Sequence, residues 1–152
     1  MRLTWDDLLI QDISPEQFRE WLTPWTGVVT GRVAPAFMNK FGTWFLRRPE
    51  GHVEMLDVLT GHLEQVADDY DDFIQEVNEQ WWQETFLLSE LVYRLHQADK
   101  VPGPAQCYAL APHPALGGPN PINGDPIDPR FVTVMHVSVW QSICAQSLNM
   151  PQ

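Results

Sequence analysis

The residue types that bind metal ions gather in the last third of the chain. They are His113, His136, Cys107, Cys144, Asp125 and Asp128. Zinc sites combine ligands in close pairs such as Cys-x-x-Cys or His-x-x-x-His, and the sequence contains neither spacing. Asp125 and Asp128 carry oxygen ligands, but the prolines beside them favour Asx turns instead. We therefore expect no metal site and no cofactor.

A second chemistry to consider is nucleophilic catalysis by a cysteine. Cys107 lies on a predicted strand, and His136 lies on the strand expected to neighbour it, so the two side chains could meet. A reactive thiolate needs exposure and cationic surroundings, whereas the sequence around Cys107 is apolar. We expect the Cys107 and His136 pair to be buried and inert, and Cys107 and Cys144 to be free thiols. No Gly-x-Ser-x-Gly motif is present, so we expect that the protein is not an enzyme.

Charge is distributed unevenly along the chain. The formal net charge is −11, from 20 Asp and Glu against nine Lys and Arg. No Lys or Arg occurs between Arg48 and Arg94, although this window holds twelve acidic residues. The average field repels nucleic-acid phosphates and anionic lipid, so we expect neither as a partner, and it attracts a basic protein. The alternative is a solvated helix face that maintains solubility, and the pattern does not separate the two.

A helix begins inside this acidic window. Apolar residues recur at spacings of three and four from Tyr70 onwards, and carboxylates crowd the first turn, where they cap N–H groups and meet the helix dipole. Trp81 and Trp82 follow, either as a stacking platform for a ligand or as part of the core. The candidate partner-binding residues of this stretch are Asp69, Asp71, Asp72, Glu76, Glu79 and Trp82.

Strand signals precede the acidic helix. Residues 44–46 are continuously apolar, as in a strand buried on both faces, and Pro and Gly supply a turn after them. Imperfect alternation over residues 53–58 and a turn at Thr60-Gly61 indicate further short strands. The pattern predicts an antiparallel meander.

The remaining segments give weaker or more local signals. Ser14-Pro15-Glu16-Gln17 is a capping box that begins a short helix. Residues 3–10 fit either a helical turn or an edge strand, and residues 25–36 are interpreted as a loop with room for a short strand. The stretch 112–130 holds six Pro and three Gly, which predicts a rigid surface loop of the kind that is usually functional.

Together these elements predict one α+β domain over residues 1–152. We expect a mainly antiparallel sheet from residues 41–66, 105–111 and 131–139, with helices 68–80 and 84–98 packed on one face and a last helix over 140–148. The helix 84–98 has the widest apolar stripe. No apolar run approaches the ~20 residues of a membrane span, and acidic residues stand where a signal peptide needs apolar ones, so we expect a cytoplasmic protein.

One stretch has a familiar pattern. Tyr108-Ala109-Leu110-Ala111-Pro112, followed by Ala115-Leu116-Gly117-Gly118, resembles the strand-Pro and Leu-Gly-Gly signature of the C-terminal domain of type VI secretion immunity proteins, which neutralise DNase effectors. The resemblance covers about residues 27–147 and includes Thr60-Gly61, the acidic helix and Val134-His136-Val137. The chain departs from that family in its Pro-rich insertion, residues 119–129.

The resemblance implies an α+β protein without enzymatic activity, and it adds Leu116, Gly117 and Gly118 to the candidate partner-binding residues. We therefore expect an immunity-like protein that sequesters a cationic protein toxin in the cytoplasm. The alternative is a small-ligand-binding domain that uses a Trp-rich pocket.

Overall fold

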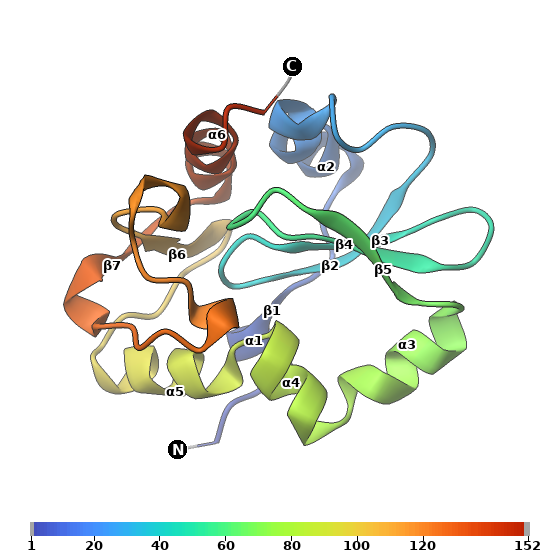
Figure 1. Cartoon of the computed structure of the whole chain (residues 1–152). Coiled ribbons are helices and arrows are strands. Elements are labelled where there is room, and N and C mark those ends of the chain that lie inside the picture. Colours follow the sequence, from blue (N-terminus) through green and yellow to red (C-terminus); the bar gives the residue numbers. More distant parts are fainter. Residues whose placement is uncertain (1, 151–152) are drawn as a thin grey trace.

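Two antiparallel sheets lie at the centre of the computed structural model, which describes residues 2–150 (Figure 1). The larger sheet has five strands in the order β1-β2-β3-β4-β5, and the smaller sheet pairs β6 with β7. The strands are β1 (Leu9–Ile10), β2 (Ala34–Asn39), β3 (Trp44–Arg47), β4 (Val53–Leu56), β5 (Leu63–Ala67), β6 (Gln106–Leu110) and β7 (Val132–His136). The helices are α1 (Trp5–Leu8), α2 (Pro15–Leu22), α3 (Tyr70–Val77), α4 (Gln80–Phe86), α5 (Ser89–Gln97) and α6 (Val137–Ser147). The predicted α+β fold class is confirmed.

Strand β3 is the middle of the larger sheet and is buried on both faces. The Trp44 ring contacts Phe18 of α2 at a centroid distance of 5.6 Å. On the opposite face, the Phe45 ring lies 5.3 Å from Trp82 of α4 and 6.0 Å from Phe73 of α3. Helices therefore cover both faces of the sheet, with α3 and α4 on one side and α2 and α6 on the other (Figure 1). This corrects the expectation that helices pack on one face.

The sheet begins earlier in the chain than the sequence pattern indicated. Strand β2 begins inside the predicted loop 25–36 and extends to Asn39, and β1 joins its edge through Leu9 and Ile10. The register shifts between Pro35 and Phe37 where β2 pairs with β3. Pro and Ala have low strand propensity, so the start of β2 gives no alternating signal.

The helices predicted over 68–80 and 84–98 differ from the structure in their boundaries. Helix α3 is shorter than the predicted 68–80: Asp69 caps its start, accepting a hydrogen bond from the Asp72 N–H at 2.8 Å, and the helix ends at Val77. The predicted helix 84–98 is two helices, since Leu88 at φ 53° interrupts the chain between α4 and α5. The capping box at Ser14 and Gln17 is confirmed, with both hydrogen bonds formed at 3.0 and 3.1 Å.

The predicted single sheet is wrong, because β6 and β7 form a separate ribbon. The Tyr108 N–H donates to the Lys40 carbonyl at 2.7 Å, and the Tyr108 ring lies 5.2 Å from Phe41, so the ribbon is attached just after β2. Strand β7 ends at His136 rather than residue 139. The His136 side chain accepts a hydrogen bond from the Ser138 N–H, which begins α6 three residues before the predicted start.

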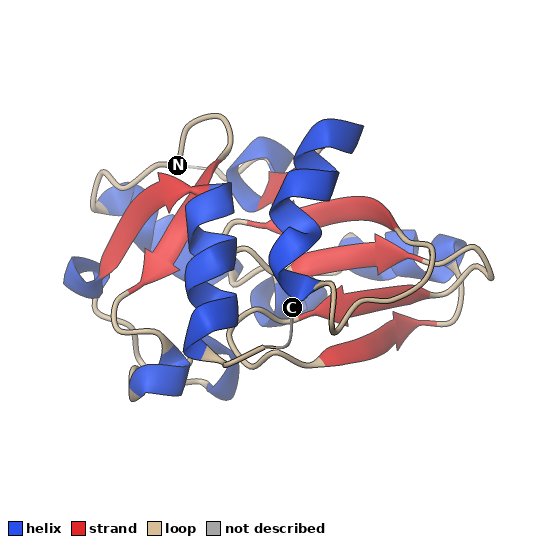
Figure 2. Ribbon diagram, turned by 90° about the horizontal axis from the view of Figure 1, so that it is seen from above, coloured by secondary structure: helices blue, strands red, loops and turns tan. Residues whose placement is uncertain are grey.

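Helix α6 is fixed to the sheet by a buried amide. The Gln141 Oε1 accepts hydrogen bonds from the indole N–H groups of Trp25 and Trp44 at 2.7 and 3.1 Å. The Gln141 Nε2 donates to the Gly42 carbonyl at 2.8 Å. Gly42 has φ 91°, and a Cβ there would lie 2.8 Å from the Trp140 ring, so the close approach of α6 requires glycine. Figure 2 shows α2 and α6 side by side across the sheet.

We predict that Gln141→Leu lowers the free energy of unfolding by roughly 3 kcal/mol or more, because each of three buried groups loses its partner at ~1–3 kcal/mol. Urea unfolding measures the change. The matched control is Gln146→Leu, an exposed position on the same helix, which should stay within about 0.5 kcal/mol of the parent protein. A Gln141→Leu protein as stable as this control would show that the amide does not hold α6 in place.

Candidate functional site

The Leu116-Gly117-Gly118 motif lies in the loop 112–130, which connects β6 to β7. Three 3-10 turns divide the loop, and each begins with a proline that follows a capping side chain. The turns are η2 (Pro114–Leu116), η3 (Pro121–Asn123) and η4 (Pro129–Phe131), capped by His113, Asn120 and Asp128. Each cap accepts a backbone N–H from two residues further on, at 2.9–3.0 Å. The loop is ordered by its own sequence, as the prolines predicted.

His113 anchors the first part of the loop to the larger sheet. Its Nδ1 accepts the Ala115 N–H at 3.0 Å, so the proton of the neutral ring is on Nε2, which donates to the Val58 carbonyl at 3.1 Å. The imidazole also packs against Trp140 at 5.7 Å. Burial lowers the pKa of His113 below its usual value. The neutral ring thus ties the loop to the segment after β4.

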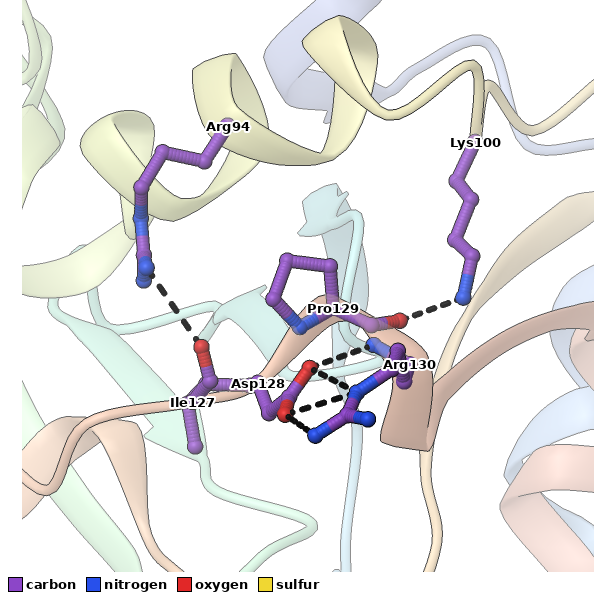
Figure 3. Close-up of polar contacts among 6 residues, drawn as sticks. All are labelled: Arg94, Lys100, Ile127, Asp128, Pro129 and Arg130. Carbon is purple, nitrogen blue, oxygen red and sulfur yellow. Dashed lines mark hydrogen bonds and ion pairs between the residues drawn. The ribbon is translucent and has the colours of Figure 1, made fainter.

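The last part of the loop is held by cations of α5 and of the segment after it (Figure 3). The Lys100 ammonium donates to the carbonyls of Pro129 and Val132, the second at 2.7 Å. The Arg94 guanidinium reaches the Ile127 carbonyl at 3.4 Å. Asp128 and Arg130 form an exposed ion pair at 2.7 Å within η4. Side-chain hydrogen bonds therefore fasten both ends of the loop to the rest of the protein.

A largely apolar pocket of about 370 Å³ opens between the two ends of the loop. Its walls include Leu110, Pro112, Gly118, Pro119, Ile127 and Phe131. A Cβ on Gly118 would lie 2.1 Å from the Pro112 carbonyl oxygen, so the pocket wall requires glycine there. Beside the pocket, Leu116 is 65% exposed and Phe131 57% exposed. This arrangement can accept an apolar side chain of a partner.

The second group of candidate residues lies on α3 and at the start of α4. Asp69, Asp71, Asp72 and Glu79 are exposed, and Glu76 is partly buried. Within residues 2–150 the ion pairs join Arg48 to Glu54 and Arg130 to Asp128, so none of these five carboxylates is paired within 4.0 Å. The Asp69 carboxylate raises the pKa of Asp72 by repulsion. The acidic helix therefore carries uncompensated negative charge.

The structure does not bring the two candidate groups together. The acidic helix α3 and the loop 112–130 lie at opposite ends of the molecule (Figures 1 and 2). Arg47 is close to α3, but its guanidinium stacks on the Tyr70 ring at 3.6 Å. The carboxylates of α3 could therefore act on a molecule bound at Leu116 only through the long-range field and not by direct pairing.

Trp82 is not available to a partner, which corrects its place among the candidates. Its side chain is fully buried and contacts Phe37, Phe45, Phe73 and Phe86 at ring distances of 5.0–6.3 Å. Its neighbour Trp81 is 53% exposed instead. Two adjacent residues of a helix point in directions about 100° apart, so one of the two Trp rings enters the core while the other faces solvent.

The structure also shows the burial and the bonding state of the two cysteines. Cys107 and Cys144 are buried free thiols, as predicted, and burial raises the pKa of Cys107 to about 12. Burial raises the pKa of Cys144 as well. The expected buried pair of Cys107 with His136 is wrong, because His136 pairs with Gln106 in the ribbon and its ring is exposed. Successive strand residues point to opposite faces, which separates the two side chains.

Two general features bear on the kind of site. No group of three or more His, Cys, Asp or Glu side chains within residues 2–150 is arranged to hold a metal ion. In the same part of the chain, no helix has the length and apolar character needed to cross a membrane.

Comparison with family models and with curated proteins finds no match to this chain.

His113 has a role that the sequence analysis does not predict. Its residue type suggests a metal ligand, but it stands before a proline, as Asn120 and Asp128 do. That shared pattern of a capping residue followed by proline is the signal in the sequence that identifies it as a cap.

We predict that the stability of the protein falls as the pH drops below the unfolded-state histidine pKa of about 6.5, and that His113 contributes to this fall. The folded-state pKa of His113 is lowered, so the unfolded chain binds the proton more readily and stability is lost as the pH falls from 7 towards 5. Urea midpoints at pH 7.0 and 5.0 measure this.

The control is His113→Asn, since Asn also caps a turn before proline in this loop. The variant should lose less stability between the two pH values than the parent does. An equal loss of stability in both proteins would show that groups other than His113 cause the pH dependence.

Proposed function

We propose that the protein is a non-enzymatic binding protein, similar in role to an immunity protein, that sequesters a cationic protein toxin in the cytoplasm. The observation that carries this proposal is the loop 112–130, which holds Leu116 and Phe131 in solvent beside an apolar pocket. Large apolar side chains that are exposed on a fastened loop are typical of binding surfaces.

Binding by this loop would be favoured because the loop is preorganised. The capped turns and the hydrogen bonds from His113 and Lys100 fix the loop before a partner arrives. Binding then loses little conformational freedom, so more of the contact energy contributes to affinity. A partner side chain that enters the pocket between Gly118 and Ile127 would be shielded from water, which is where interface energy concentrates.

The negative charge of the protein favours a basic partner. The net charge of −11 and the unpaired carboxylates of α3 favour the approach of a basic protein. Such long-range attraction acts on the association rate, whereas the loop would determine the lifetime of the complex. The resemblance of the Leu-Gly-Gly segment to immunity proteins supports the same role.

The test is to purify the small basic proteins encoded beside this gene and to titrate each into the protein by calorimetry. We expect a 1:1 complex with one of them, with Kd below ~1 μM, and protection of cells that express it. If none of them binds, or if one binds and its toxicity persists, the proposed function is wrong.

We predict that Leu116→Ser combined with Phe131→Ser weakens that complex by roughly 30-fold or more, because truncating central anchors costs about 2 kcal/mol or more. The change should appear mainly in the dissociation rate. The matched control is Ile74→Ser, an exposed apolar position on α3, at the other end of the molecule. Equal affinity of the double variant and the control would remove the loop from the interface.

A separate prediction concerns the acidic helix. Changing Asp71 and Asp72 to Asn and Glu76 and Glu79 to Gln should slow association by about 10-fold at low salt and change dissociation little. Asp69 is kept because it caps α3. Added salt should reproduce the effect in the parent protein, since the screening length at 0.15 M is about 8 Å. Stopped-flow rates that are equal for both proteins across a salt series would leave α3 as a solvated face.

A further inference from the structure

A groove of about 530 Å³ runs between helix α2 and the segment 26–33, which leads from it to strand β2 (Figure 1). Its apolar floor is formed by Phe18, Leu22 and Val33. These three side chains are only partly buried, so each keeps apolar surface open to the groove. The volume is within the range of small-molecule sites. The groove shares no lining residue with the pocket of the loop 112–130.

Two arginines line this groove. Arg19 comes from α2 and Arg32 from the opposite segment, and both are exposed. Within residues 2–150 no carboxylate lies within 4.0 Å of either guanidinium, and the side-chain hydrogen bonds that reach these residues end on their backbone carbonyls. Protein groups engage five other cations of the chain: Arg47, Arg48, Arg94, Lys100 and Arg130. Arg19 and Arg32 can therefore both contact a ligand.

The charge of its lining distinguishes this groove from other concave surfaces of the protein. Among residues 2–150 no Asp or Glu lines it, although the chain contains 20 of them. Carboxylates do line other pockets, namely Asp128 beside the loop 112–130, Asp6 and Asp12 beside α1, and Glu84 and Glu90 beside α5. The lining of the groove thus carries only positive charge, in a protein whose net charge is −11. Guanidiniums in direct contact with an anion act where the net charge is screened over about 8 Å at 0.15 M salt.

Both walls of the groove are held in place by other parts of the protein. The Arg48 guanidinium donates to the carbonyls of Thr30 and Arg32 at 2.6 and 3.3 Å. Arg48 is fixed in turn by its ion pair with Glu54 of β4. The opposite wall is α2, whose capping box is complete. Because the walls are formed before a ligand arrives, binding loses little conformational freedom.

These features limit the class of ligand. A small inorganic anion would pair with the arginines but leave the apolar floor in water. A nucleotide or a peptide would place many polar groups against side chains that offer no hydrogen bond. A fatty acid suits both parts of the groove, because its carboxylate matches the fork of a guanidinium and the rest of the molecule is apolar.

We propose that this groove binds a free fatty acid. The carboxylate lies between Arg19 and Arg32, and the hydrocarbon chain lies along Phe18, Leu22 and Val33. This site goes beyond the proposed toxin binding and does not depend on it. Each methylene group that leaves water favours the complex, so the affinity should rise with the length of the chain.

The binding experiment is calorimetry with decanoate, kept below its micelle concentration, and with three analogues. Butyrate keeps the carboxylate and shortens the chain, decanol lacks the charge, and decylamine reverses it. We expect decanoate to bind with Kd below ~100 μM and each analogue to bind more weakly by roughly 10-fold or more. The proposal is wrong if decanoate does not bind or if any analogue binds as tightly.

The variant that tests the carboxylate contact combines Arg19→Gln with Arg32→Gln. It should weaken decanoate binding by roughly 10-fold or more, because charge-assisted hydrogen bonds are lost. Its Tm should stay within about 2 °C of the parent protein, since both side chains are exposed. The matched control combines Arg2→Gln with Arg130→Gln, two exposed residues outside the groove, and changes the net charge equally. Equal affinity of the two double variants would contradict the proposal.

A photoreactive fatty acid locates the chain without any substitution. Decanoate with a diazirine at the far end of its chain is crosslinked to the protein by light, and mass spectrometry identifies the labelled residues. We expect labels within residues 15–33. Labels within residues 112–130 would place the fatty acid in the other apolar pocket. Sedimentation with phosphatidylglycerol vesicles without binding of free decanoate would assign the groove to a membrane surface, and either result would overturn the proposal.

Discussion

The buried amide of Gln141 is the interaction on which the rest of the fold depends. It joins α6 to two parts of the chain that are distant in sequence, the 3-10 turn η1 (Thr23–Trp25) and the segment of Gly42 and strand β3. A buried indole N–H is stabilised by an acceptor, and here one side-chain oxygen serves two of them. Because the amide also holds α6 against the sheet, it sets the position of β7, which precedes α6 directly. The loop 112–130 ends just before β7, so its position also depends on this amide.

The exposed loop 112–130 is therefore connected to the buried core by side chains next to Gln141. Trp140, the neighbour of Gln141, donates its indole N–H to the Phe41 carbonyl and packs on His113. His113 in turn caps the first turn of the loop. A binding surface that is fastened to the core in this way loses little entropy when a partner arrives. The same fastening explains how so irregular a segment can be ordered on the surface.

The carboxylates of α3 differ from the apolar loop in how they would act on a partner. They are exposed, so water compensates them and their effect on a partner would be a long-range field. This situation suits the attraction of a basic protein, whereas the loop 112–130 would act by direct contact.

The sequence by itself determined the features that depend only on residues close together in the chain. The capping box at Ser14, the apolar strand 44–46, the N-cap at Asp69 and the proline-ordered loop are all local, since caps and turns depend on residues within about four positions. The fold class followed from these elements. Tertiary structure decided the rest: helices on both faces of the sheet, the separate ribbon of β6 and β7, and the burial of Trp82. Each of these depends on contacts between residues far apart in sequence, and the pattern of side chains along one segment does not say which distant segment will cover it.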